Sequence, residues 1–212
     1  MKKICVIAVH PDDETLGCGG TLLKHFKNGD DIYCIFVTSG NEKQKKYIDK
    51  ISKEYSFKNV FNLGLEELRL SDISLNDIIP LISKIFKEVK PEIIYMPNRS
   101  DVHSDHKAIF NAVLSCTKSF RYPFIRKVLM MEVISETDFS LGLPETMFIP
   151  NYYVDISETF EQKIQIMKMY ESEMLEYPHT RNESTMTALN RYRGSLIGTE
   201  YAEAFMAIKI VE

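Results

Sequence analysis

The chain has 212 residues, of which 44% are hydrophobic and 26% charged, and its formal net charge is −4. This composition is typical of a soluble globular protein, and we expect residues 1–212 to form a single domain with a substantial core. The sequence has no basic tract and no apolar run near the roughly 20 residues of a membrane span, which argues against a nucleic-acid partner and a membrane-spanning segment.

Strand-like and helix-like segments alternate along the first two thirds of the chain. The strand-like segments are short apolar runs rich in β-branched residues, and the helix-like segments lie between turn signals, with apolar residues spaced three or four apart in 71–90. This order predicts an α/β protein, a Rossmann-like three-layer αβα sandwich with a mostly parallel sheet. The expected strands are 3–9, 31–38, 59–63, 92–97, 127–134 and 152–156, and the expected helices are 14–28, 42–55, one within 71–90, 105–118 and 158–170.

The pattern weakens after about residue 138. A polar segment follows the last expected helix, and a final strand is expected at 206–211. The run YAEAF at 201–205 fits a helix packed just before that strand. We find no internal repeat, low-complexity segment or linker.

Polar side chains gather in two loops that follow the first and fourth expected strands. The first loop reads HPDDE at 10–14, and the second reads NRSDVHSDH at 98–106. In a doubly wound sheet of order 3-2-1-4-5, strands 1 and 4 are neighbours, and ligands bind outside their carboxyl ends. The two loops are therefore expected to face each other across one crevice.

These loops carry the residue types of a catalytic metal site. His10 and Asp13 are three apart on a strand-to-helix turn, and the run 103–106 (HSDH) adds two imidazoles and a carboxylate at a helix start. Two histidines and one carboxylate are sufficient protein ligands for a catalytic zinc. Because Asp12 and Asp13 are adjacent, one is expected to bind the ion and the other to lie near its water, and the residues alone do not say which.

Helix capping is the alternative interpretation of HPDDE. Proline at the first helical position, with aspartate and glutamate beside it, is what a helix N-terminus favours. Neither loop alone decides between capping and metal binding. Together they contain three of the five histidines of the chain in two loops expected to be adjacent, and this combination favours a metal site.

The paired motifs AVHPDDE and HSDH resemble the LmbE/PIG-L family of zinc-dependent de-N-acetylases, and the similarity runs over nearly the whole chain. The resemblance implies a Rossmann-like sheet and removal of acyl groups from amino sugars. It assigns the metal to His10, Asp13 and His106, and the role of general base to Asp12. It implies that His103 stabilises the oxyanion or protonates the amine, that Asp105 orients a neighbouring histidine, and that Glu14 is structural.

The substrate contacts are less well defined by the sequence. The C-terminal runs YPHTR and RYRG…YAEAF resemble the bacillithiol-biosynthesis branch of the family, although each of these residues could equally belong to a solvated segment. Two places depart from common family patterns, KYID at 46–49 in place of R-x-x-E and LGLEE at 63–67 in place of L-G-x-x-D. The candidate substrate-binding residues are Asn41, Arg99, Asp101, His179 and Arg181, with Arg191 and Arg193 as possible substrate or subunit contacts.

The glycine-rich run 17–20 (GCGG) does not predict a nucleotide site. Its spacing is not G-x-G-x-x-G, and it lies inside the first expected helix rather than in the turn before it. We expect these glycines to allow close packing of the helix on the sheet. The turn itself is filled with charged residues, which argues against NAD binding.

The cysteines indicate a reducing compartment. Cys5, Cys18, Cys34 and Cys116 form no C-x-x-C pair, and Cys5 and Cys34 sit in apolar runs where a thiol behaves as a small buried hydrophobe. The apolar run 4–9 is too short for a signal sequence. A cytoplasmic location is therefore expected.

These observations predict a metal-dependent hydrolase that removes the N-acetyl group from an N-acetylglucosamine-type amino sugar or its conjugate. The resemblance implies a Zn²⁺-bound water with Asp12 as general base, although a site of two histidines and an aspartate also accepts other divalent ions. The alternatives are a non-catalytic sugar- or metal-binding protein on the same scaffold, or a deacetylase of a nucleotide sugar or glycan precursor rather than a glucosaminyl-malate-type substrate. The expected partner is a small-molecule amino sugar, and the oligomeric state is open, a homo-oligomer included.

Overall fold

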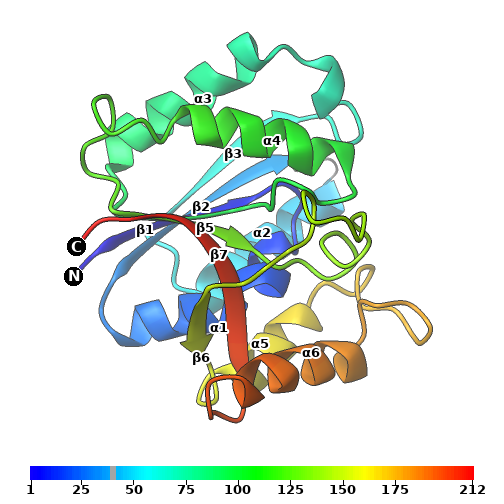
Figure 1. The fold of residues 1–212 in the computed structure, drawn as a ribbon. Helices are drawn as coiled ribbons and strands as arrows, with labels where there is room; N and C mark the ends of the chain where they lie inside the picture. Colours follow the sequence, from blue (N-terminus) through cyan, green and yellow to red (C-terminus); the bar gives the residue numbers. More distant parts are fainter. Residues whose placement is uncertain (39–41) are drawn as a thin grey trace.

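The computed structural model describes residues 1–38 and 42–212, with the side chains of all of these except 42–44. Figure 1 shows a central sheet between layers of helices. The strands are β1 (Lys3–Ala8), β2 (Asp31–Thr38), β3 (Asn59–Leu65), β4 (Ile93–Met96), β5 (Lys127–Met131), β6 (Tyr152–Asp155) and β7 (Ala202–Ile210). The helices are α1 (Asp13–Lys27), α2 (Glu42–Glu54), α3 (Leu75–Val89), α4 (Ser104–Ser115), α5 (Phe160–Met167) and α6 (Glu183–Ser195), with a short 3₁₀ helix η1 (Leu70–Asp72).

The strand order in the described chain is β3-β2-β1-β4-β5-β7-β6. The first five strands pair in parallel, and β7 is antiparallel to both β5 and β6. This topology confirms the predicted α/β class with its mostly parallel sheet and the order 3-2-1-4-5. β1 pairs with β4 in register from Ile4 opposite Ile93, which places the loops after these strands side by side.

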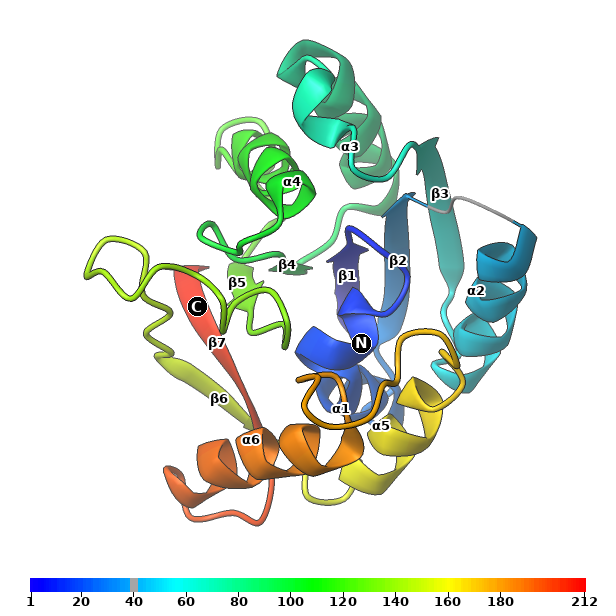
Figure 2. The same cartoon turned by 90° about the vertical axis from the view of Figure 1, so that its right-hand side faces the viewer.

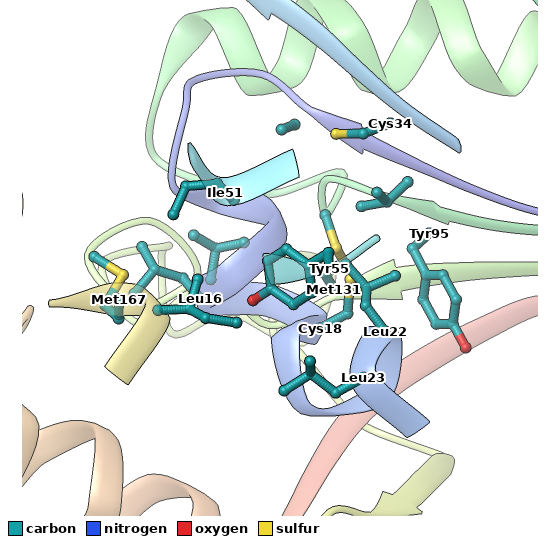
Figure 3. Close-up of a cluster of buried hydrophobic side chains, with 14 of the residues drawn as sticks. Leu16, Cys18, Leu22, Leu23, Cys34, Ile51, Tyr55, Tyr95, Met131 and Met167 are labelled. Atoms are coloured by element: carbon teal, nitrogen blue, oxygen red, sulfur yellow. The ribbon is translucent and has the colours of Figure 1, made fainter. Parts of the chain in front are cut away.

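Helices cover both faces of the sheet (Figures 1 and 2). The central strand β1 shows the reason, because alternate residues enter different cores. Ile4 and Val6 pack in the core that includes α1, α2 and α5, while Cys5 and Ile7 pack in the core beneath α3 and α4. A strand buried on both faces reads as a continuous apolar run, as KICVIA does. Figure 3 shows part of the first core.

The glycine-rich run packs tightly against the sheet, as predicted. A Cβ at Gly17 would lie 2.8 Å from the Cβ of Met131, and one at Gly20 would lie 2.8 Å from the Cβ of Ile156. These separations are below van der Waals contact, so only glycine allows α1 to approach this closely. The close approach positions the first turn of α1, where Asp13 lies.

Helix α1 is not continuous, since Cys18 has non-helical angles (φ −150°, ψ 20°) that kink it. A kink leaves backbone groups without helical partners. The carboxylate of Glu203 on β7 accepts hydrogen bonds from the N–H groups of Gly20 (2.9 Å) and Thr21 (2.8 Å). The ammonium of Lys163 on α5 donates to the carbonyl of Leu16 (3.0 Å) and to Glu203 (2.7 Å). This buried ion pair therefore supplies hydrogen-bond partners for backbone groups on both sides of the kink.

The structure corrects two predictions for the C-terminal third. The YAEAF run is not helical, because Ala202 to Phe205 belong to β7, where Glu203 points inward to the kink of α1. The polar segment expected after α5 contains α6, which begins where the side chain of Asn182 accepts a hydrogen bond from the N–H of Thr185. Its low apolar content gave no periodic signal, and a cap of this kind is common outside helices as well.

All four cysteines are buried and free, as expected for Cys5 and Cys34 from their apolar surroundings. Burial raises the pKa of the Cys5 thiol, so it packs as a hydrophobic group. Among the described helices, none combines the length and apolarity needed to cross a membrane.

Candidate metal centre

The loops after β1 and β4 meet at the carboxyl ends of these strands and bring His10, Asp13 and His106 together. Asp13 opens α1, and His106 lies in the first turn of α4. One ligand atom from each of the three residues lies within 4.8 Å of the others. His10, Asp12, Asp13 and His103 line a cavity of about 160 Å³. The predicted crevice between the two loops is therefore present.

The ligand atoms of this group lie close to one another. Oδ2 of Asp13 lies 3.3 Å from Nε2 of His106 and 4.0 Å from Nδ1 of His10. Nε2 of His106 is fully buried and has no hydrogen-bond partner among the described residues. A buried nitrogen aimed at a carboxylate and a second imidazole fits a metal ligand, and the nitrogen and oxygen donor set is one that Zn²⁺ prefers.

Each histidine is held by a carboxylate at its other nitrogen. Asp101 Oδ2 lies 2.8 Å from Nδ1 of His106, and Asp105 Oδ2 lies 3.2 Å from Nε2 of His10. Metal-binding histidines commonly donate their second N–H to a carboxylate in this way, which fixes the tautomer and the ring orientation. The arrangement leaves Nε2 of His106 and Nδ1 of His10 free for the ion.

A second group, formed by His10, His103 and Asp105, also has ligand atoms within 4.8 Å of one another. It is less suited to a metal, because Asp105 already accepts hydrogen bonds from the N–H groups of Leu68 (2.7 Å) and Leu70 (3.1 Å). Nδ1 of His103 accepts from the N–H of Asp105 (3.1 Å). The group of His10, Asp13 and His106 is therefore the better candidate.

The electrostatics of the centre favour a cation. Burial acts to raise the pKa of Asp13, but the neighbouring imidazoles of His106 and His10 and the hydrogen bond from the backbone N–H of His10 bring it down to about 2. Burial acts to lower the pKa of His106, and the carboxylates of Asp13 and Asp101 raise it well above its ordinary value. A positive charge is thus stabilised at the point where the ligand atoms meet.

Asp12 stands beside this group without joining it. Its backbone lies at φ 139° and ψ −25°, and its side chain makes no capping hydrogen bond to α1. Oδ2 of Asp12 lies 3.1 Å from Nη1 of Arg181, which also contacts Glu173 at 3.0 Å. Burial and the charge of Asp13 raise the pKa of Asp12, against the opposing effect of Arg181. A buried carboxylate with a raised pKa suits a general base.

Glu14 lies behind Asp12 and is fully buried. Its carboxylate accepts hydrogen bonds from the N–H of Asp12 (3.2 Å) and from the hydroxyl groups of Thr15 (2.6 Å) and Tyr170 (2.7 Å). Burial raises the pKa of Glu14 to about 7. These contacts hold the unusual backbone conformation of Asp12. They fit the structural role that the family resemblance implies for Glu14.

His103 caps α4 and faces the cavity. Because Nδ1 accepts the N–H of Asp105, the neutral ring carries its proton on Nε2. Burial and the nearby rings of His10 and His106 lower the pKa of His103, which favours the neutral form. The ring centroid lies 4.6 Å from that of His10. His103 is thus placed to donate a hydrogen bond into the cavity.

The structure separates the five predicted substrate-binding residues. Asn41 lies outside the described residues. Arg99 is exposed and donates to the carbonyl of Glu145 (2.7 Å), and Asp101 is fully buried behind His106, where it also accepts from Thr137 (2.7 Å). Asp101 therefore positions a candidate ligand instead of meeting substrate.

His179 lines a neighbouring groove, whereas Arg181 lines both this groove and the cavity. The other two arginines of the C-terminal segment make ion pairs, Arg193 with Glu132 and Arg191 with Glu200.

Three acidic residues that line the cavity were not among the predicted site residues. Glu67, Glu136 and Glu173 contribute to its wall. Glu67 falls in the LGLEE stretch, where the sequence departs from the L-G-x-x-D pattern, so that departure was the available signal. Glu136 and Glu173 lie in irregular loops with no motif of their own.

Comparison with known proteins gives a family for this site. Residues 5–117, more than half of the chain, match the family model described as PIG-L, GlcNAc-PI de-N-acetylase. The chain belongs to this family. The match spans β1 to α4 and so includes both loops of the PIG-L centre described above. The resemblance of the C-terminal segment to the bacillithiol branch stays a prediction.

Relatives of this PIG-L protein include deacetylases. Diacetylchitobiose deacetylase from Thermococcus kodakarensis is 25% identical over 96% of this chain and 82% of its own length. The solved structure of N,N′-diacetylchitobiose deacetylase from Pyrococcus horikoshii has a TM-score of 0.78 at 18% identity, covering 98% of this chain and 84% of that chain.

The fold alone does not determine the reaction. A solved structure of GalB, the 4-carboxy-2-hydroxymuconate hydratase from Pseudomonas putida, has a TM-score of 0.77 at 14% identity, covering 100% of this chain and 99% of that chain. The reaction of this PIG-L member must therefore be argued from the site.

Proposed function

We propose that this PIG-L family protein is a Zn²⁺-dependent hydrolase that removes the acetyl group from an N-acetylglucosamine-type amino sugar or its conjugate. The observation that carries the proposal is the carboxylate-backed group of His10, Asp13 and His106 beside the separate, buried carboxylate of Asp12. The similarity to diacetylchitobiose deacetylase over nearly the whole chain supports the amide C–N bond of an acetamido group as the bond that is cleaved.

In this mechanism His10, Asp13 and His106 hold the metal. A divalent ion so bound polarises a carbonyl oxygen and lowers the pKa of water. Asp12 removes a proton from the water that attacks the acetyl carbon. Arg181 engages Oδ2 of this carboxylate at 3.1 Å.

His103 acts on the other side of the reacting carbonyl. Its Nε2–H donates a hydrogen bond to the oxygen that becomes negative, which stabilises the transition state. The proton held by Asp12 is then delivered to the sugar nitrogen as the C–N bond breaks. The products are acetate and the free amine. A neutral His103 favours its role at the oxyanion over the protonation of the amine, the two roles that the sequence left open.

Acetate release from N-acetylglucosamine, its glycosides and nucleotide sugars, with added Zn²⁺, tests the reaction and separates the sugar classes. Asp12→Asn should retain bound zinc and lose kcat by at least about 10²-fold, the lower range for removal of a general base. His106→Ala should lose both zinc and turnover. Lys50→Gln on the exposed surface of α2 serves as a control and should match the unsubstituted protein.

The alternative, a non-catalytic sugar- or metal-binding protein, has no need of Asp12. If Asp12→Asn binds zinc and leaves every measured property unchanged, the binding protein is the better description. Acetate release by a metal-free His106→Ala protein would overturn the assignment of the metal ligands.

A further inference from the structure

A second and larger cavity adjoins the metal centre. It is an open groove of about 670 Å³, lined by the loop that follows β5 and the loop that precedes α6. Its lining includes Ser135, Glu136, Phe139, Leu175, Pro178 and Arg181. Glu136 and Arg181 also line the cavity at the metal centre, so the two spaces are adjacent and share these two lining residues.

Hydrogen bonds join the two loops that line the groove and close the second loop. The hydroxyl groups of Ser135 and Thr180 form a hydrogen bond of 2.8 Å across the groove floor. The N–H of Leu175 donates to the carbonyl of Arg181 (2.9 Å) and closes the second loop on itself. One side-chain hydrogen bond therefore joins the two loops, and one backbone hydrogen bond closes the second loop.

The groove differs from the metal cavity in its chemistry. The exposed wall of the metal cavity is mostly polar. The exposed wall of the groove is more apolar, although Glu176 and His179 also line it together with the shared Glu136 and Arg181. Phe139 is 61% exposed and Leu175 is 41% exposed, and Pro178 lies beside them on the groove wall. Large apolar side chains that gather in one concave site, next to a reaction centre, typically mark a ligand-binding surface.

The volume of the metal cavity suggests that one substrate occupies both spaces. Sites for drug-sized ligands measure roughly 300–1,000 Å³, so a cavity of about 160 Å³ is too small for a conjugate and fits its acetamido end. A group attached to that end and directed past Glu136 and Arg181, which line both spaces, would meet Phe139 and Leu175.

We propose that the groove binds an apolar aglycone, so that the substrate is an N-acetylated amino sugar conjugated to an apolar group. The inference rests on the proposed deacetylase function and adds the chemical class of the second half of the substrate. Phe139 and Leu175 contact the aglycone and set the preference for it, while the metal centre holds the acetamide. The two lining residues that the groove shares with the metal cavity favour a substrate group over a second copy of the chain as the occupant.

The test compares kcat/KM for N-acetylglucosamine with that for its phenyl and butyl glycosides, each as both anomers. For one anomer, we expect kcat/KM for the phenyl glycoside to exceed that for the free sugar by about tenfold or more, because the phenyl ring is partly buried in the groove. The double substitution Phe139→Ser and Leu175→Ser should bring this ratio close to one. Phe120→Ser is the matched control, because Phe120 is 78% exposed in the turn after α4, and its ratio should not change.

Several results would overturn the inference. A ratio near one for both anomers in the unsubstituted protein, or a high ratio that survives the double substitution, would show that the groove does not bind an apolar aglycone. A double variant with a smaller mass in light scattering would show that a second copy covers the groove.

If no substrate releases acetate, the proposed function fails. Calorimetric binding of the phenyl glycosides then decides the inference alone: equal affinity in the unsubstituted protein and the double variant would refute it.

Discussion

The buried pair of Lys163 and Glu203 offers a quantitative test of how α1 is held. Both side chains are almost fully buried, and their N–O separation is 2.7 Å. Substituting Lys163→Met leaves the carboxylate of Glu203 without its cation and the carbonyl of Leu16 without a donor. Removing one partner of a buried ion pair costs about 3–5 kcal/mol. Because domains are stable by only about 5–15 kcal/mol, we expect a large loss.

Urea denaturation measures this loss. With an m-value of about 2–3 kcal/mol/M for a chain of this size, a loss of 4 kcal/mol lowers the midpoint by about 1.5–2 M. The surface pair of Lys168 and Glu183 supplies a matched control, since its separation is 2.8 Å but its side chains are 42% and 54% exposed. Lys168→Met should change the free energy of unfolding by less than about 1 kcal/mol.

A double variant identifies the physical cause. Adding Glu203→Gln to Lys163→Met removes the uncompensated charge and keeps one of the two oxygens that accept from the N–H groups of Gly20 and Thr21. The double variant should therefore be more stable than Lys163→Met alone. If Lys163→Met resembles Lys168→Met, or if the two effects at the buried pair simply add, the kink does not depend on this pair as we argue.

Three further predictions concern the metal centre and its support. Asp101→Asn should weaken Zn²⁺ affinity by about 10–100-fold, because the candidate ligand His106 loses its carboxylate partner. Competition with a chromophoric chelator measures the affinity, and an unchanged value would contradict this role of Asp101. Arg181→Met should raise the pKa of Asp12, because the cation that opposes the effect of burial is removed. Since a base must be deprotonated to act, the acid limb of the kcat/KM profile should move to higher pH without loss of zinc, and a shift to lower pH would refute the pairing. Gly20→Ala should destabilise the protein by about 1–3 kcal/mol in thermal or urea unfolding, because the new Cβ would lie 2.8 Å from Ile156. A stability equal to that of the unsubstituted protein would show that the neighbouring side chains move to make room for the Cβ.

The sequence predicted the sheet well because its signals are local. Buried parallel strands are continuous apolar runs, and the helices between them have turn signals at their ends, so the segments up to β5 were located to within a few residues. The order of the strands then followed from the rules of βαβ connection. The same rules brought the loops of His10 and His106 together, although the contacts that they make span up to 95 residues of chain.

The features that were missed depend on long-range contacts. The contact of Arg181 with Asp12 was not predicted, because the two residues are 169 apart in the chain and a single arginine in a polar loop does not indicate which carboxylate it will meet. Glu203 was placed on a helix because YAEAF has good helix formers. It lies in a strand because the kink at Cys18 exposes N–H groups that only a distant carboxylate satisfies.

The carboxylate of Asp105 has a consequence for how this protein can change its specificity. It joins the ring of His10 to the loop after β3, but it contacts that loop only through the backbone N–H groups of Leu68 and Leu70. Side chains in the loop can therefore be exchanged without removing a single hydrogen bond that orients His10.

Leu68 is 68% exposed, and Glu67 beside it reaches the cavity wall. Two positions restrict this exchange: Leu68, whose positive φ of 63° favours glycine or asparagine as replacements, and Leu70, whose side chain is fully buried in the core beneath α3 and α4. The loop is thus an evolvable element, free to acquire new substrate contacts while the orientation of His10 is inherited unchanged.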